Sequence, residues 1–111
     1  MLARHWRGWT APEDADAYER LLTDDLLPRF AREAGDGLRG YELGRRAAGE
    51  EVAFATTIYF DSRAAVEAFA GADPERAHVP EPARALLVRW EETATHYEVR
   101  AREPPQLQGD G

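Results

Sequence analysis

Apolar and polar positions alternate along three stretches of the chain, and this period of two predicts β-strands. The stretches are residues 2–10, 38–46 and 51–60. A turn at residues 48–50 joins the second and third stretches into a hairpin. One face of the third stretch carries Val52, Phe54, Ile58 and Phe60, and the other carries Ala53, Ala55, Thr57 and Tyr59. Because neither face is polar, we expect this strand to be central and covered on both sides.

Helical spacing begins directly after the first predicted strand. We expect Thr10 to be the N-cap, Pro12 to lie in the first turn and Glu13 to complete a capping box. Apolar residues then recur on one helical face, at Ala15, Tyr18, Leu22 and Leu26. Pro28 interrupts this pattern, so we expect a break or kink just before it and another helical stretch over residues 30–33.

A second helix is predicted over residues 63–70, capped by Asp61-Ser62. Residues 74–87 are predicted to be irregular, with helical turns around Glu75 and from Pro82 to Leu87. The fourth strand is predicted over residues 93–102. Residues 103–111 contain no core-forming pattern, and we expect a disordered tail.

The element order is therefore βαββαβ within one domain, residues 1–102. Right-handed crossovers give an antiparallel sheet in the order 4-1-3-2, with both helices on one face. This is an α+β, ferredoxin-like fold. The other face of the sheet must also be buried, and we expect a homodimer that packs two sheets face to face as a dimeric α/β barrel.

The first strand has an unusual pattern for a half-buried strand. Trp6 shares one face with Arg4, whereas Trp9 shares the other with His5 and Arg7. Because aromatic and basic groups lie on both faces, we expect both faces to be covered. At least one of them should contact something other than a hydrocarbon core.

Composition and charge exclude several classes of function. The chain has a net charge of −7, which argues against nucleic acid or an anionic membrane as a partner. It has no cysteine, so disulfides and thiolate metal sites are excluded, and its three histidines lack metal-ligand spacing. No apolar run approaches the roughly 20 residues of a membrane span. The N-terminal residues have no apolar signal-peptide region, so we expect a cytoplasmic protein.

Several short motifs occur in an order that is typical of one superfamily. They are Trp6-Arg7-Gly8, Pro12-Glu13-Asp14-Ala15-Asp16-Ala17-Tyr18, Phe60-Asp61-Ser62, Ala68-Phe69-Ala70-Gly71, Pro74-Glu75-Arg76-Ala77 and His96-Tyr97-Glu98-Val99. In these motifs, over residues 2–101, the chain resembles the antibiotic biosynthesis monooxygenase (ABM) superfamily of dimeric α/β barrels. The resemblance implies the fold and the dimer. The superfamily includes cofactor-independent monooxygenases that oxidise polycyclic phenols to quinones, haem-degrading monooxygenases and polyketide cyclases.

The resemblance gives two interpretations of His78. In the haem-degrading branch an axial histidine follows the second helix, about ten residues after a tryptophan that presses on the porphyrin. Here Phe69 stands near the position of that tryptophan, and His78 lies within one residue of the ligand position. The first-strand asparagine of that branch has no counterpart, because the chain contains no asparagine. Alternatively, His78 is a surface histidine near a helix C-terminus.

His96 and His5, on neighbouring predicted strands, are the candidate catalytic residues. An unperturbed histidine pKa near 6.5 suits a general base, although His96 would equally suit a hydrogen bond in a dimer interface. Candidate ligand-binding residues, besides Phe69 and His78, are Trp6, Arg7, Tyr18 and Tyr59. The aromatic residues would line a flat pocket or form plain core. Arg4 or Arg7 would hold a phenolate.

Three hypotheses of function follow. The first is a cofactor-independent ABM-type monooxygenase, or a related cyclase, that acts on a small hydrophobic aromatic metabolite and requires no cofactor. The second is a protein that binds or degrades haem. The third is a non-enzymatic dimer that binds a small hydrophobic molecule.

Overall fold

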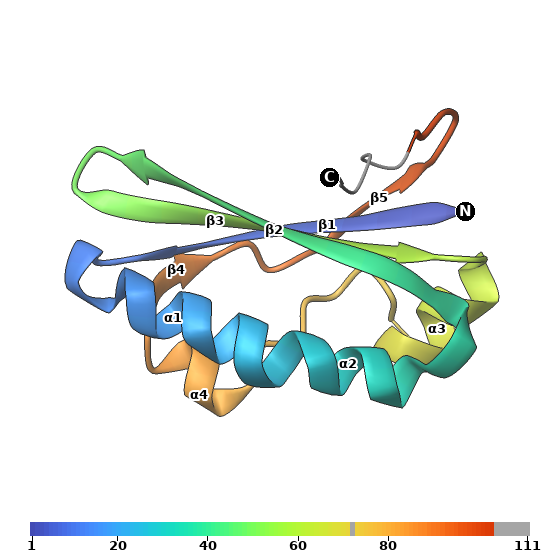
Figure 1. The fold of residues 1–111 in the computed structure, drawn as a ribbon, viewed down its shortest axis with the longest axis horizontal. Coiled ribbons are helices and arrows are strands. Elements are labelled where there is room, and N and C mark those ends of the chain that lie inside the picture. Colours follow the sequence, from blue (N-terminus) through green and yellow to red (C-terminus); the bar gives the residue numbers. More distant parts are fainter. Residues whose placement is uncertain (72, 104–111) are drawn as a thin grey trace, which may run out of the picture.

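A computed structural model describes residues 1–71 and 73–103 of the chain. It shows an α+β fold in which all described helices lie on one side of one antiparallel sheet (Figure 1). The strands are β1 (Leu2–Thr10), β2 (Leu38–Ala48), β3 (Glu51–Phe60), β4 (Leu87–Trp90) and β5 (Thr95–Glu98). The helices are α1 (Ala15–Leu21), α2 (Leu27–Ala34), α3 (Arg63–Ala70) and α4 (Glu81–Arg84). The predicted fold class is confirmed.

The strand order is β2-β3-β1-β4, and β5 pairs with β1 beside β4. The predicted order is therefore confirmed, but the predicted fourth strand over residues 93–102 is too long, since only Thr95–Glu98 forms a strand there. A further strand, β4, precedes it, so that β4 pairs with the Thr10 end of β1 and β5 with the Leu2 end. Between them the chain leaves the sheet because its backbone pairs elsewhere. The amide of Ala94 donates to the carbonyl of Glu75 at 2.7 Å, and the amide of Ala77 donates to that of Glu92 at 2.9 Å.

The predicted cap of the first helix is wrong. Thr10 is the last residue of β1 and is completely buried, and its hydroxyl has no hydrogen-bond partner among the described residues. The chain instead enters α1 through a 3-10 turn at Pro12–Asp14, without a side-chain cap. The capping box with Glu13 is therefore absent from this turn. The predicted cap of the second helix is confirmed, since the Ser62 hydroxyl accepts a hydrogen bond from the amide of Ala65 at 3.2 Å.

Pro28 does not break the helix. The turn before it, Leu22–Leu26, widens into a π-helix, and α2 continues directly from Leu27. Proline has no amide hydrogen to donate, and its ring collides with the carbonyl four residues earlier in a regular α-helix. A wider turn relieves both problems, so α1, the π-turn and α2 form one continuous rod across the sheet (Figure 1).

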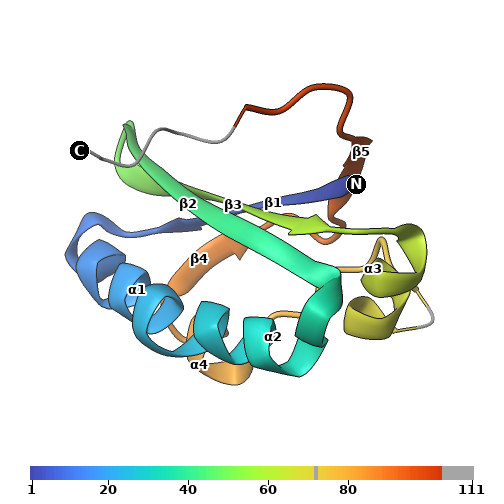
Figure 2. The same cartoon turned by 45° about the vertical axis from the view of Figure 1, so that its right-hand side comes forward.

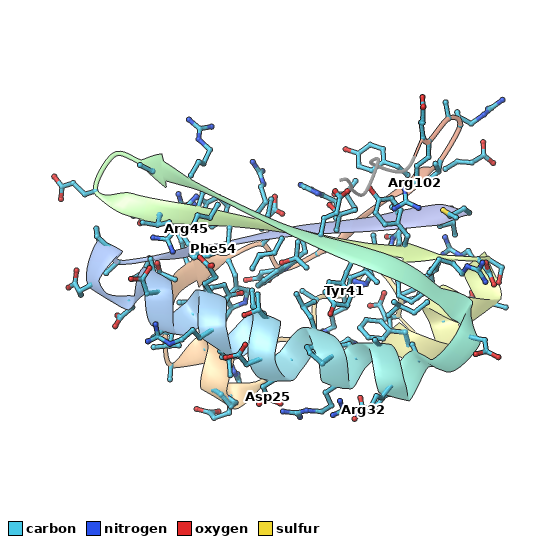
Figure 3. All side chains as sticks on the ribbon, viewed as in Figure 1. Asp25, Arg32, Tyr41, Arg45, Phe54 and Arg102 are labelled. Carbon is cyan, nitrogen blue, oxygen red and sulfur yellow. The ribbon has the colours of Figure 1, made fainter. Side chains whose placement is uncertain are left out.

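The core lies between the sheet and the helices. The largest fully buried side chains include Tyr18, Phe54 and Phe60, and the rings of Tyr18 and Phe54 meet edge to face at 4.8 Å. No helix among the described residues covers the opposite face, which we call the open face (Figures 1 and 2). Past β5 the chain turns back on that side, where the Arg102 guanidinium lies 4.2 Å from the Tyr59 ring (Figure 3).

Residues 104–111, most of the predicted disordered tail, lie outside the described residues. No helix among the described residues is long and apolar enough to cross a membrane.

Candidate functional site

A cavity of about 590 Å³ lies between the sheet and the helices, in the layer that holds the core. β1 contributes Arg4 and Trp6, α1 contributes Tyr18, and the π-turn contributes Leu22 and Leu26. Phe30 of α2, Phe69 of α3, Thr56 and Ile58 of β3, and the loop residues Arg76 to Pro80 complete most of the wall. The wall is mostly apolar, with a few polar groups, as is typical of small-molecule sites.

Aromatic side chains give one wall of the cavity a defined shape. The Phe69 ring lies 5.4 Å from both Phe30 and Phe60, so the three rings form a continuous cluster. The Trp6 ring is fixed by a hydrogen bond that its Nε1 donates to the carbonyl of Glu91 at 2.6 Å. The cavity therefore presents flat, apolar surfaces whose positions are set before any ligand binds.

Arg4 is the charged residue buried most deeply in this wall. Its residue surface is only 7% exposed, and it forms no ion pair with any described residue. One guanidinium nitrogen donates to the carbonyl of Arg76 at 3.1 Å, the guanidinium carbon lies 5.8 Å from the centre of the Phe69 ring, and Nε has no partner in the described part of the chain. Burial lowers the pKa of Arg4.

His96 lies beside Arg4, because the two residues are directly paired between β5 and β1. It does not line the cavity. Both of its ring nitrogens are buried, and neither has a hydrogen-bond partner among the described residues. Burial and the positive charges of Arg4 and Arg63 lower the pKa of His96, and Glu75 opposes them in part. His96 is therefore neutral at pH 7.

Three of the candidate residues lie on the open face and do not reach the cavity. His5 Nδ1 lies 3.1 Å from the hydroxyl of Thr57, and the Tyr59 hydroxyl lies 3.5 Å from a Glu42 carboxylate oxygen. Arg7 binds the Glu91 carboxylate through two guanidinium nitrogens, at 2.8 and 3.1 Å, and through its own amide at 2.9 Å. Its guanidinium also lies 5.5 Å from the Trp9 ring.

The contact with Arg7 changes the pKa of Glu91. Partial burial raises its pKa, but the hydrogen bonds and charge of Arg7 outweigh that effect, and the pKa is lowered overall. The pair between Arg7 and Glu91 is therefore satisfied within the chain.

Of the three histidines, only His78 lines the cavity. Its Nε2 lies 2.9 Å from the carbonyl of Ala70. A carbonyl can only accept, so Nε2 carries the proton and donates, and this leaves the lone pair of the neutral ring on Nδ1. The residues present do not fit a haem ligated through Nε2, because that nitrogen is already bonded and because Phe69 replaces the tryptophan.

The structure thus brings together Trp6, Tyr18, Phe69 and His78 from the candidate set, and it separates His5, Arg7, Tyr59 and His96 from the cavity. Of the two arginines predicted to hold a phenolate, Arg4 lines the cavity and Arg7 does not. The alternation along β1 places Arg4 on the same face as Trp6, and this pattern in the sequence could have identified Arg4 as a cavity residue. Burial raises the pKa of Tyr18, which keeps its phenol neutral.

No family model matches the chain, and no curated protein matches it in sequence. Three solved structures share its fold. A proposed antibiotic biosynthesis monooxygenase from Deinococcus radiodurans superposes with a TM-score of 0.60 at 18% identity, over 98% of this chain and 100% of that one. Rv0793 from Mycobacterium tuberculosis superposes with a TM-score of 0.55 at 25% identity, over 93% of this chain and 98% of that one. A proposed antibiotic biosynthesis monooxygenase from Bacillus cereus superposes with a TM-score of 0.58 at 11% identity, over 97% of this chain and 100% of that one. The resemblance to the ABM superfamily is confirmed at the level of the fold.

Proposed function

We propose that the protein is a cofactor-independent monooxygenase of the ABM type that acts on a small aromatic metabolite bound between the sheet and the helices. The observation that carries this proposal is the cavity of about 590 Å³, which lies within the size range of small-molecule sites and has aromatic walls. The names of two of the solved structures with this fold support the reaction class. Fold alone does not determine chemistry, so the proposal depends on the site.

The substrate class is a polycyclic phenol with a methylene group between two aromatic rings. Trp6 and Phe69 would stack on the rings, and Nδ1 of His78 would remove a proton from the methylene carbon. The resulting carbanion is delocalised into the phenol, and dioxygen oxidises it. One oxygen atom becomes the new carbonyl of the quinone and the other leaves as water. The four electrons lost by carbon are those that dioxygen accepts.

Oxygen uptake with anthrone-type phenols tests this proposal, together with the absorbance of the quinone product. We expect turnover in the wild type and a loss of roughly 10²-fold or more in His78→Ala, the range typical of a general base. His5→Ala is the matched control, because His5 lies on the open face. Absence of uptake across a broad panel of phenols would contradict the proposed reaction. Turnover that depends on His5 instead would contradict the assignment of the base.

We further propose that the protein is a homodimer in which the open faces of two sheets pack together. The open face carries small residues at its centre, among them Ala53, Ala55 and Gly44, with larger side chains such as Trp9 beside them. Tyr97, 59% exposed, lies on the same face through its pairing with Ala3. Burying such a surface between two copies removes apolar area from water.

Light scattering after size exclusion tests the dimer. The chain has a mass of 12.5 kDa, and we expect the wild type to elute at twice that mass. Ala55→Glu places a charge at the centre of the open face and should give monomers. Ala64→Glu, on the exposed surface of α3, is the matched control and should leave the mass unchanged. A wild type of 12.5 kDa at micromolar concentration would refute the dimer.

A further inference from the structure

We propose that the cavity selects a flat aromatic molecule with one oxyanion, a carboxylate or an ionised phenol, and that the guanidinium of Arg4 binds this oxyanion. The inference rests on the proposed function, in that it names the class of ligand that the same cavity takes. It assigns to Arg4 the role of a residue that determines specificity.

The first argument is the unbalanced charge of Arg4. A buried guanidinium is costly unless an anion compensates it. Only 7% of the surface of Arg4 is exposed. Arginine has five N–H donors in a planar fork. The described residues supply one acceptor, the carbonyl of Arg76, and leave Nε without a partner. Carboxylates and phenolates match the unused donors, and an arginine fork binds a carboxylate through two parallel hydrogen bonds.

The neighbours of Arg4 do not supply the missing anion. Its cross-strand partner His96 is neutral at pH 7, since burial and the nearby positive charges of Arg4 and Arg63 lower its pKa. Phe69 offers only the face of its ring, at 5.8 Å from the guanidinium carbon. The compensating charge therefore has to come from a molecule in the cavity that Arg4 lines.

The second argument is the charge at the exposed part of the cavity wall. Arg76 and Arg84 line it, and among the described residues the one carboxylate that lines it is that of Glu33. Arg84 is paired with Glu81 at 3.3 Å, whereas Arg76 forms no ion pair with a described residue. Although the chain has a net charge of −7, the described lining of the cavity has three arginines and one carboxylate. Such a lining raises the local concentration of anions.

The third argument is the apolar remainder of the wall. Trp6, Phe30 and Phe69 present aromatic surfaces, and the π-turn adds leucine side chains. A π-turn is rare and is frequently found at functional sites. A ligand that satisfies both the guanidinium and the apolar wall has a flat apolar body and an anionic group. This excludes neutral hydrocarbons as preferred ligands.

The experiment compares two ligands that differ only in charge, 2-naphthoate and its methyl ester, by titration calorimetry at pH 7.5. We expect wild-type protein to bind the acid at least tenfold more tightly than the ester. In Arg4→Met this preference should disappear, with the affinity for the ester retained. Arg4→Lys, which keeps the charge and loses the fork, should keep part of the preference. Arg7→Met, on the open face of the same strand, is the matched control and should behave as wild type.

Each result decides the proposal. An ester that binds wild type as tightly as the acid overturns it, as does a preference for the acid that survives in Arg4→Met. Absence of binding by both ligands overturns it as well. If Arg4→Met does not fold, the comparison of acid and ester in wild type decides alone. Oxygen uptake separates this inference from the proposed function: a preference for the acid without any uptake refutes only the monooxygenase, and uptake without the preference refutes only the role of Arg4.

Discussion

Replacing Arg4 with methionine should make the folded protein more stable, although Arg4 is buried and hydrogen-bonded. Methionine is unbranched like the arginine stem and fills part of the same space with apolar atoms, although it ends short of the guanidinium. The substitution removes a charge that is 7% exposed and has no ion-pair partner among the described residues. Replacement of buried charges by well-packed apolar side chains is often neutral or stabilising.

The magnitude follows from the contacts of Arg4. The substitution removes one hydrogen bond from a charged donor to the Arg76 carbonyl, worth about 1.5–3 kcal/mol. It also removes the contact with the Phe69 ring, worth about 0.5 kcal/mol because 5.8 Å is close to the limit of such contacts. Against these losses stands the desolvation penalty of a buried ion, several kcal/mol in real proteins. We expect a net gain of about 1 kcal/mol in the free energy of unfolding.

The assay is urea denaturation followed by far-UV circular dichroism, with the midpoint and the slope fitted separately. The midpoint should rise at constant slope, and the melting temperature should rise by roughly 4 °C for a domain of this size. Arg7→Met is the matched control from the same strand. Arg7 is bound to Glu91 and its side chain is 51% exposed, so its replacement should destabilise the protein slightly.

A loss of stability of about 1 kcal/mol or more in Arg4→Met would refute this reasoning. Such a loss would show that the chain already compensates the guanidinium, and it would remove the first argument for an anionic ligand. A gain in stability together with a loss of oxyanion binding would be the trade-off expected of a residue kept for function.

Three further predictions concern single contacts. The NMR signals of the His96 ring protons should titrate with a pKa below 6.5, mainly because His96 is buried. The unfolded chain then binds this proton at a higher pH than the folded chain, so the free energy of unfolding should fall as the pH drops below about 6.5. His96→Gln should flatten that part of the pH profile. A pKa at or above 6.5 would contradict this. Gly8→Ala places a Cβ 2.9 Å from Leu87 Cδ2 and should cost about 1–3 kcal/mol in thermal or urea unfolding, whereas an unchanged midpoint would show that Leu87 moves freely. Ser62→Ala removes the bond to the Ala65 amide and should cost about 1 kcal/mol, with no loss if water replaces the cap.

Residues with a strong period of two determine most of the sheet, and this part was predictable. β1 and β3 have the bounds that the alternation predicts, and right-handed connections then leave one strand order. β4 was missed because it has only four residues, Leu87–Trp90, too few to show a period. It forms because β1 offers an unpaired edge beyond the end of β5.

The candidate site was predictable only where it depends on one strand or one helix. Alternation along β1 places Arg4 and Trp6 on the same face, and both line the cavity. The place of His96 depends on the register between β5 and β1, which a local pattern does not contain. The place of His78 depends on a bond to the carbonyl of Ala70, eight residues earlier, and no periodicity predicts such a bond.

The basic residues of β1 have different partners because they lie on opposite faces of the sheet. On the open face the carboxylate of Glu91 and the Trp9 ring satisfy Arg7, and the Thr57 hydroxyl lies within hydrogen-bond distance of His5, so no ligand is needed to account for either residue. On the helix face Arg4 has one carbonyl and one ring, and the chain supplies no described carboxylate. The residue that follows β4, Glu91, provides a carboxylate for Arg7, whereas the residue paired with Arg4 across the strands is the neutral His96. Since an uncompensated buried charge lowers stability, its presence beside an aromatic cavity favours a function that uses that charge.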